Sequence, residues 1–165
     1  MKILYQIKTI HYSKGILFPI PIINDEIFMC ASPNNEETFI VEVNPHLFLK
    51  LWRKTSCTIQ APIAKGNESS WKKDYKYKYA QQGFAAGVTN PVPLASVNIL
   101  ETNDHQIELS LGDGVTRTIY LLSIKAPYFP VSCTSLKSAM LLQKVAGFSE
   151  GTVYTLSELL SDKTN

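Results

Sequence analysis

Seven consecutive residues in the C-terminal half of the chain combine the groups best suited to bind a phosphate. A glycine-rich turn that ends at a helix N-terminus exposes backbone N–H groups at the positive end of the helix dipole. Arg117 can add a charge-assisted hydrogen bond worth about 1.5–3 kcal/mol, and two threonines can add hydroxyl donors. The sequence therefore predicts a phosphate-binding loop, whose Asp113 and Arg117 are also the candidates for a catalytic role. The seven residues are Gly112, Asp113, Gly114, Val115, Thr116, Arg117 and Thr118.

Simpler interpretations of this loop stay open. In an ordinary glycine-containing turn, Asp113 would cap the helix and Arg117 would be exposed. Asp113 could equally ligate a metal ion beside a bound phosphate. The segment is neither a Walker A loop nor a Rossmann fingerprint, because it lacks the glycine and lysine spacing of both. Asp74 and Glu108 are weaker candidates for a general base, since nothing in the sequence places them near the loop.

The composition predicts an ordinary globular protein. The chain has 165 residues, 45% of them hydrophobic and 18% charged, which suits one domain over residues 1–165. Its formal net charge of +2 is too small to argue for nucleic acid by itself. A local basic segment is best interpreted as a solvated face, with contact to a polyanion as the alternative. Its cations are Lys50, Arg53, Lys54, Lys65, Lys72, Lys73, Lys76 and Lys78.

The cysteines and histidines do not indicate a metal site. Cys30, Cys57 and Cys133 form no C-x-x-C pair, and the 3 histidines are scattered. An odd number of cysteines in a chain of this size suggests reduced thiols and a cytoplasmic protein. Residues 1–10 alternate, unlike a signal peptide, and no stretch approaches the roughly 20 apolar residues of a membrane-spanning helix. We expect no insertion into a membrane.

Strands in the N-terminal third of the chain are the first elements expected to help position the loop. Alternating or β-branched residues predict strands at residues 3–10 and 39–43. Residues 16–23 are apolar, but Pro19 and Pro21 restrict them to an edge strand or an extended segment. The N-terminal third is therefore expected to contribute to a sheet.

Helices are predicted in the middle of the chain. Asn44 caps a helix that begins at Pro45, and residues 61–70, rich in Pro, Gly, Asn and Ser, are expected to form a loop. A second helix is predicted over residues 72–84. The stripe expected to be buried in the first helix is Leu47, Leu51 and Trp52.

Tyrosines and lysines interleave in the second of these helices. Tyr75 and Tyr79 share a face with Gln82 or Gly83, which favours an amphipathic helix with its aromatic side buried. The alternative is a surface on which nucleic-acid bases stack and lysines contact phosphates.

The C-terminal half alternates strands with helices. Together with the preceding segments, it predicts one compact α/β (α+β) domain with a small mixed sheet and surrounding helices. Residues 147–153 are similar to the turn of a helix-turn-helix, but a C-terminal helical hairpin that closes the core is the simpler interpretation. Strands are expected at 90–100, 106–111 and 128–133, and helices at 116–125, 135–146 and 155–160.

The loop and its flanks resemble a known superfamily. The run from Asp113 to Arg117 is similar to the D-G-x-H-R loop of ParB/sulfiredoxin-like proteins. Within that superfamily, the chain most resembles the plasmid fertility inhibition factors, the Osa-like proteins, over residues 71–147. The residues that carry this resemblance are Trp71, Asp74, Lys76, Tyr77, Ala80, Gly83, Phe84, Gly87, the run Asn90 to Ala95, the run Asp113 to Thr118, Leu121, Leu122, Ala126 and the run Phe129 to Val131.

The resemblance implies a ParB/sulfiredoxin-like domain that binds nucleotide or nucleic-acid phosphates. It implies interference with conjugative DNA transfer through a type IV secretion system, at its coupling protein. ATP hydrolysis and DNA cleavage have been linked to members of the family, so ATP or another nucleotide with Mg²⁺ is a candidate ligand. Asn90, in the other matching block, is a further candidate site residue.

The departures from the superfamily pattern limit what can be transferred. Thr116 stands at the His position, so a His-dependent step does not carry over. Val115 stands at the position of the sulfiredoxin cysteine, which excludes sulfinic acid reduction. The long DNA-binding region of segregation ParB proteins has no counterpart.

Three hypotheses about function follow. The first is an inhibitor of conjugation that contacts the transfer machinery and binds phosphates. The second is a ParB-like nucleotide hydrolase or DNA nuclease that uses Asp113 and Arg117. The third is a DNA-binding regulator that uses the basic segment and the C-terminal hairpin. Fold resemblance alone does not decide among them, because function depends on the site.

Overall fold

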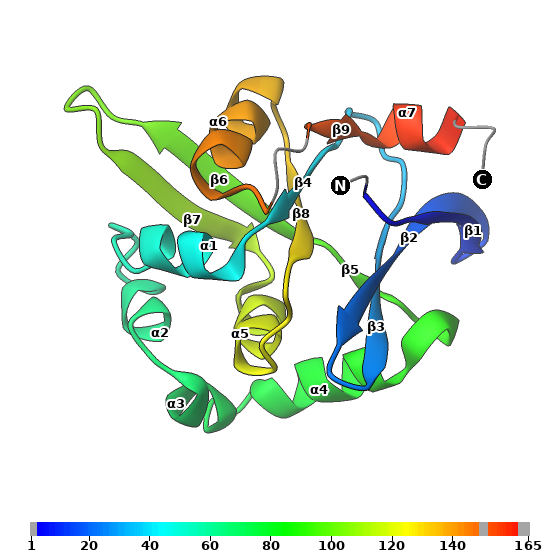
Figure 1. Ribbon diagram of the computed structural model, residues 1–165, viewed down its shortest axis with the longest axis horizontal. Helices are drawn as coiled ribbons and strands as arrows, with labels where there is room; N and C mark the ends of the chain where they lie inside the picture. Colours follow the sequence, from blue (N-terminus) through cyan, green and yellow to red (C-terminus); the bar gives the residue numbers. More distant parts are fainter. Residues whose placement is uncertain (1–2, 149–151, 162–165) are drawn as a thin grey trace.

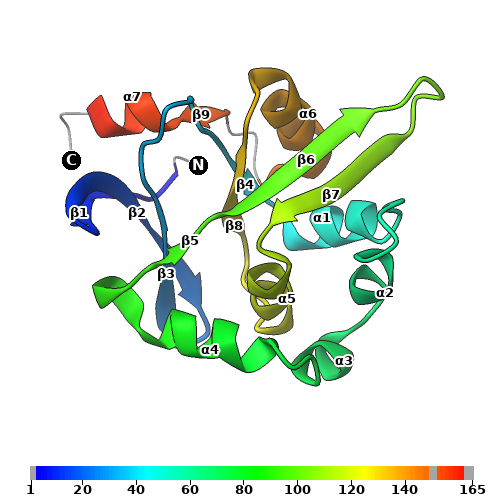
Figure 2. The same ribbon diagram turned by 180° about the vertical axis from the view of Figure 1, so that it is seen from behind.

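The computed structural model describes residues 3–148 and 152–161, which form two mixed sheets with helices around them (Figures 1 and 2). The predicted α/β class and compact single domain are confirmed, with two sheets in place of one. In the described residues the first sheet has the order β1-β2-β3-β5 and the second the order β7-β6-β8-β4-β9. The strands are β1 Gln6–Ile10, β2 Ser13–Ile22, β3 Asp25–Ala31, β4 Phe39–Val43, β5 Val92–Pro93, β6 Ala95–Glu101, β7 Ile107–Asp113, β8 Phe129–Cys133 and β9 Tyr154–Thr155.

The helices lie around the sheets instead of in one layer. In Figure 1, α1 to α4 follow an arc along the lower left and bottom of the molecule, and α5 lies between that arc and the strands. No helix in the described ranges is long and apolar enough to cross a membrane. The helices are α1 Pro45–Trp52, α2 Ala61–Ala64, α3 Glu68–Lys72, α4 Tyr77–Ala85, α5 Val115–Ser123, α6 Leu136–Ala146 and α7 Leu156–Ser161, with a 3-10 turn, η1, at Gly87–Thr89.

The first sheet shows how the prolines of β2 are accommodated. The prediction of an edge strand is wrong, because β2 pairs with β1 on one side and with β3 on the other. However, β1 pairs only with residues 13–17, so Pro19 and Pro21 lie beyond it and face a partner on one side alone. Neither proline therefore interrupts the pairing of β2 with β1. The strand β3 follows a turn at Asn24, whose φ is 62°.

Helix α1 begins as predicted, and of its expected buried stripe Trp52 is confirmed but Leu47 is not. The Asn44 side chain accepts hydrogen bonds from the backbone N–H groups of His46 and Leu47. Phe48 and Trp52, four residues apart, are fully buried, whereas Leu47 is 42% exposed. The rings of Phe48 and Phe129 meet edge to face with centroids 5.9 Å apart, which joins α1 to the central strand β8.

Three segments after α1, up to and including β6, are more broken than predicted. The expected loop at 61–70 contains α2 and the start of α3, because Asn67 and Ser70 form a capping box. The expected helix at 72–84 is interrupted, and α4 begins only at Tyr77, where the Asp74 side chain accepts a hydrogen bond from the Lys76 N–H. The expected strand at 90–100 is split, since β5 joins the first sheet and β6 the second.

Glu42 on β4 makes the stability of the fold depend on pH. Burial raises the pKa of Glu42 from 4.5 to about 7. Below the lower value the carboxyl is protonated in both the folded and unfolded states. As pH rises from 4.5 through 7, the unfolded state loses its proton first, so the folded state is progressively destabilised.

We expect Glu42→Gln to stabilise the protein at high pH only. The shift corresponds to about 3 kcal/mol, which partial exposure of the side chain reduces to about 1–2 kcal/mol. Urea unfolding should therefore show the variant more stable than wild type by about 1–2 kcal/mol near pH 8, and equal to it near pH 4. An advantage of the same size at both pH values would contradict this origin.

Candidate functional site

The turn between β7 and α5 depends on glycine. The predicted loop is shorter than expected, because β7 continues through Asp113 and α5 begins at Val115. Gly114 between them has a φ of 94°, in the region that favours glycine. A Cβ atom on Gly114 would lie 2.7 Å from the Ala95 Cβ and 2.9 Å from the Ala95 Cα. Both the conformation and the close approach of β6 therefore require glycine here.

The N-terminus of α5 is not capped by a side chain. Gly114 is the N-cap residue, and the alternative in which Asp113 caps the helix is wrong. Within the described residues, the backbone N–H groups of Val115, Thr116 and Arg117 have no hydrogen-bond partner, whereas the Thr118 N–H donates to the Gly114 carbonyl. The first turn therefore presents N–H donors at the positive end of the helix dipole.

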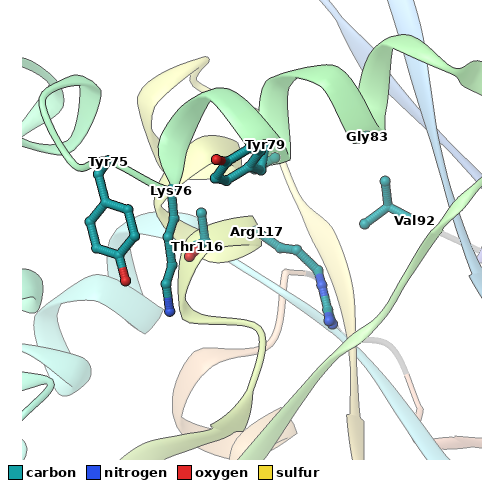
Figure 3. A pocket seen from close by; sticks show the side chains of 8 residues that line it. Tyr75, Lys76, Tyr79, Gly83, Val92, Thr116 and Arg117 are labelled. Carbon is teal, nitrogen blue, oxygen red and sulfur yellow. The ribbon is translucent and has the colours of Figure 1, made fainter.

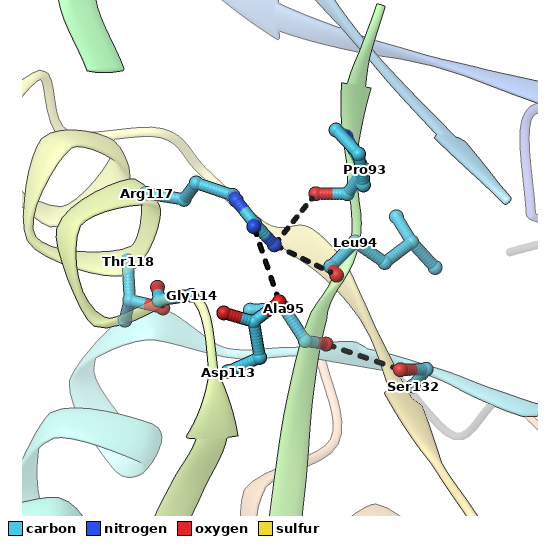
Figure 4. Close-up of polar contacts among 8 residues, drawn as sticks. All are labelled: Pro93, Leu94, Ala95, Asp113, Gly114, Arg117, Thr118 and Ser132. Atoms are coloured by element: carbon cyan, nitrogen blue, oxygen red, sulfur yellow. Dashed lines mark hydrogen bonds and ion pairs between the residues drawn. The ribbon is translucent and has the colours of Figure 1, made fainter. Parts of the chain in front are cut away.

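Arg117 lies across this turn and is held by three contacts (Figure 4). Its Nη1 donates to the backbone carbonyls of Pro93 and Leu94 at 3.4 and 3.2 Å. Its Nη2 donates to the Asp113 Oδ2 at 3.2 Å, one turn away along the chain. A guanidinium has five N–H donors, so Nε and one Nη2 hydrogen are without a partner among the described residues. The side chain is 24% exposed and remains able to reach a ligand.

The other predicted site residues are placed differently. The Thr118 side chain is fully buried and its hydroxyl donates to the Gly114 carbonyl at 2.9 Å, so it is not a donor to a ligand. Gly112 is part of β7, next to Ser96, where β6 and β7 change register. Asn90 ends η1 on the surface and does not line the cavity beside Arg117.

A cavity of about 360 Å³ opens beside this turn, between α4 and the start of α5 (Figure 3). Thr116 and Arg117 line it from α5, and Val92 lines it from β5. Its other walls come from α4 and the turn before it. These residues are Tyr75, Lys76, Tyr79, Ala80 and Gly83.

The tyrosines of the cavity correct the predicted orientation of α4. Its buried side consists of Tyr77, Ala80 and Phe84, while Tyr75 and Tyr79 are 73% and 59% exposed. Phe84 stacks on Tyr120 with ring centroids 4.9 Å apart, which fixes α4 against α5. The face predicted to be buried is thus the face that lines the cavity, because α4 starts after the turn at Asp74.

The weaker candidates for a general base lie elsewhere. Glu108 accepts hydrogen bonds from the Ser56 N–H and hydroxyl, which lower its pKa, and the Asp74 side chain accepts the Lys76 N–H in the turn before α4. Neither lines the cavity beside Arg117. No group of three or more His, Cys, Asp or Glu side chains that could hold a metal occurs in the described part of the chain.

One cysteine is close to the site although it is far away in sequence. The Cys30 Sγ donates to the Pro91 carbonyl at 3.4 Å, and burial raises the pKa of this thiol despite the charge of Arg117. A thiol held neutral in this way is a poor nucleophile. Val115 remains at the position of the sulfiredoxin cysteine, as the first residue of α5.

The elements proposed for DNA binding are only partly described. The segment 147–153, which is similar to the turn of a helix-turn-helix and was interpreted as part of a helical hairpin, includes residues 149–151, which lie outside the described residues. After them, β9 pairs with β4, and α7 buries Leu156 and Leu159 in the core. The lysines and the arginine of the basic segment are all exposed, and Arg53 donates to the carbonyls of Ala64 and Gly66.

Comparison with known proteins identifies a family and a solved structure that this chain resembles. A sequence model of the plasmid fertility inhibition factors matches residues 40–147, from β4 to the end of α6. The protein osa of Shigella flexneri is 31% identical over 133 residues, which cover 80% of this chain and 69% of that protein. The crystal structure of the oncogenic suppression activity protein, a plasmid fertility inhibition factor studied as a gold(I) cyanide derivative, superposes with a TM-score of 0.80. It is 29% identical, and the match covers 95% of this chain and 81% of that one. The chain therefore belongs to the plasmid fertility inhibition factor family.

Proposed function

We propose that this protein inhibits conjugative DNA transfer from the cytoplasm by binding the coupling protein of a type IV secretion system, and that the cavity beside Arg117 holds the phosphate of a nucleotide or nucleic acid. Membership of the family supports the inhibition of plasmid fertility. The phosphate site and the partner are the further steps that we infer.

The observation that carries the phosphate site is the convergence of donors at the start of α5. Thr116 and Arg117, whose backbone N–H groups are unpaired within the described residues, line one cavity together with Lys76. An anion is favoured there by about 0.3–1 kcal/mol from the helix dipole and by about 1.5–3 kcal/mol from a charged hydrogen bond. These terms together suit a phosphate better than a neutral ligand.

The residues present are compatible with a nucleotide that carries Mg²⁺. Magnesium in such sites is held by one or two carboxylates and by the phosphates themselves. The Asp113 side chain is 73% exposed, and its contact to Arg117 uses only one carboxylate oxygen. Asp113 does not line the cavity itself, but it contacts Arg117, which does, and is therefore the residue that would contact the ion.

The lining of the cavity favours binding over hydrolysis. Its eight residues include no His, Asp or Glu that could act as a general base. A positioned acid or base typically contributes about 10²–10⁴ in rate, so a site without one is at best a slow enzyme. A ParB-like hydrolase or nuclease and a DNA-binding regulator remain the alternatives.

Removal of the guanidinium tests the phosphate site. Arg117→Ala is expected to weaken the binding of ATP, CTP or short DNA by about 10- to 150-fold, because it loses a charged hydrogen bond. Calorimetric titration would measure this, with thermal unfolding to show that the variant is folded. Lys50→Ala removes an exposed charge from α1 and serves as the control. Equal affinity of wild type and Arg117→Ala would exclude Arg117 from the site.

A further inference from the structure

Strand β1 is an outer strand of the first sheet, on the side of the molecule away from α1 to α3 (Figures 1 and 2). It pairs with β2, and no other strand of the described residues lies beside it. The remaining outer strands are short or partly covered, since β5 and β9 have two residues each and the Gln60 side chain pairs with Leu111 of β7. This leaves β1 as an open edge of 5 residues.

The turn between β1 and β2 determines which backbone groups of β1 face outward. Ile10 and Ser13 pair across a two-residue turn, and both residues of the turn have positive φ. A pair that closes such a turn exchanges both of its N–H···O bonds, and along an antiparallel ladder every second pair does the same. Lys8 therefore bonds to β2, whereas the N–H and C=O groups of Ile7 and Thr9 point away from it.

Four backbone groups are thus free to pair with a further strand. In the described residues no hydrogen bond reaches β1 from any segment other than β2. The side chains of Lys8 and Thr9 are exposed and that of Ile7 is half-buried, so an extended chain has access to the edge. Such an edge is the template on which many proteins bind a partner in extended conformation.

The hairpin of β1 and β2 is basic. Lys8 and Lys14 are exposed and make no ion pair within the described residues, and residues 3–24 contain no Asp or Glu. The next acidic residues, at the start of β3, lie at the end of β2 that β1 does not reach. Glu37 and Glu158 accept hydrogen bonds at the end of α7 next to β9, which belongs to the second sheet. The charge of this edge therefore favours an acidic partner.

A second copy of the chain is a poor occupant of the edge. Antiparallel pairing that uses all four outward groups would set Ile7 opposite Thr9 of the other copy. The same register sets Lys8 opposite Lys8, and like charges directly opposite each other destabilise a pair of strands. Lysine on an edge strand is a common protection against such self-pairing.

We propose that the edge of β1 binds an extended acidic segment of a partner protein, which adds a strand to the first sheet and places a carboxylate opposite Lys8. The residues on either side of that carboxylate would lie opposite Ile7 and Thr9, where β-branched side chains fit a strand. Backbone hydrogen bonds supply the affinity, and the charge selects the partner. None of these residues lines the cavity beside Arg117, so the inference goes beyond the proposed phosphate site and does not rest on it.

Fluorescence anisotropy with labelled, capped octapeptides tests the proposal on the full chain. Wild type should bind a peptide of alternating glutamate and valine at least about fivefold more tightly than one of alternating lysine and valine. Methylation of the valine backbone nitrogens removes the donors that face β1. It should weaken the glutamate peptide by at least about threefold.

Three variants locate the binding on β1. Thr9→Pro removes an outward N–H but no bond to β2, so it should weaken the glutamate peptide by about 2- to 13-fold. Thr9→Val keeps the N–H and is the matched control. Lys8→Glu should weaken the glutamate peptide by about 2- to 30-fold and strengthen the lysine peptide. Thermal unfolding would show that each variant is folded.

The possible outcomes are distinct. Equal affinity of wild type for the methylated and unmethylated peptides would exclude strand addition, whether or not Thr9→Pro folds. Equal binding of the lysine and glutamate peptides would exclude an acidic partner. Dimerisation of wild type that Thr9→Pro abolishes and Thr9→Val does not would assign the edge to a second copy and overturn the proposal.

The phosphate site and the edge of β1 can fail independently. Arg117→Ala should leave the affinity for the glutamate peptide unchanged, and Thr9→Pro should leave the affinity for ATP unchanged. Loss of peptide binding in Arg117→Ala would place the peptide at the cavity and contradict the proposal.

Discussion

Replacing Gln60 by leucine is expected to lower the free energy of unfolding by about 3–5 kcal/mol, because it leaves three buried backbone or indole groups without partners. The Gln60 Nε2 donates to the Leu111 carbonyl at 2.8 Å, and its Oε1 accepts the Leu111 N–H at 2.9 Å. The same oxygen accepts the Trp52 Nε1–H at 3.0 Å. The amide thus pairs with the edge of β7 as a neighbouring strand would.

The measurement is urea unfolding of wild type, Gln60→Leu and the control Gln82→Leu. Gln82 is exposed on α4, so its replacement should change stability by less than about 0.5 kcal/mol. Because Leu111 lies three residues before Gly114, loss of the amide should also loosen the turn before α5. A loss below about 1 kcal/mol for Gln60→Leu would show that the network is not important for stability.

Local signals in the sequence were sufficient to predict many elements. Asn44 caps α1 as predicted, and Ser135 caps α6 at the start of the helix expected at 135–146, since both side chains accept backbone N–H groups of the first turn. The strand at Phe39–Val43 has the predicted bounds. These predictions depended on neighbours in the sequence, which is where capping and β-propensity act.

Long-range contacts account for much of what the sequence could not show. The role of Gln60 depends on Leu111, which is 51 residues away. The split of the expected strand at 90–100 depends on which sheet each half joins, and no local pattern encodes that choice. Pro19 and Pro21 led to the wrong prediction of an edge strand, because the sequence did not reveal that β1 would pair with the part of β2 that precedes them.

The candidate site likewise combines features that local sequence signals predict with features that depend on long-range contacts. The turn and the position of Arg117 at a helix N-terminus follow from Gly114 and its neighbours. Tyr75 and Tyr79 were predicted to be buried but are exposed, because the break before Tyr77 changes which face of α4 packs against the core. A signal was present, since an Asp side chain that accepts the N–H two residues on forms a turn, as Asp74 does with Lys76.

We propose that the family's function depends on one set of residues. Plasmid fertility inhibition follows from the family, and the site offers a way in which it could depend on a ligand. Arg117 joins the turn before α5 to the carbonyls of Pro93 and Leu94, at the point where the chain passes from the first sheet to the second. A phosphate bound there would contact both parts of the fold.

The most direct test of this account is the frequency of conjugation from donors that express the protein. Donors would carry a conjugative plasmid with a type IV secretion system and express wild type, Arg117→Ala or Lys50→Ala at equal levels. The account predicts that wild type and Lys50→Ala reduce transfer. With Arg117→Ala, transfer should recover about tenfold or more, in line with the expected loss of affinity. Inhibition by Arg117→Ala as strong as that by wild type would contradict the account.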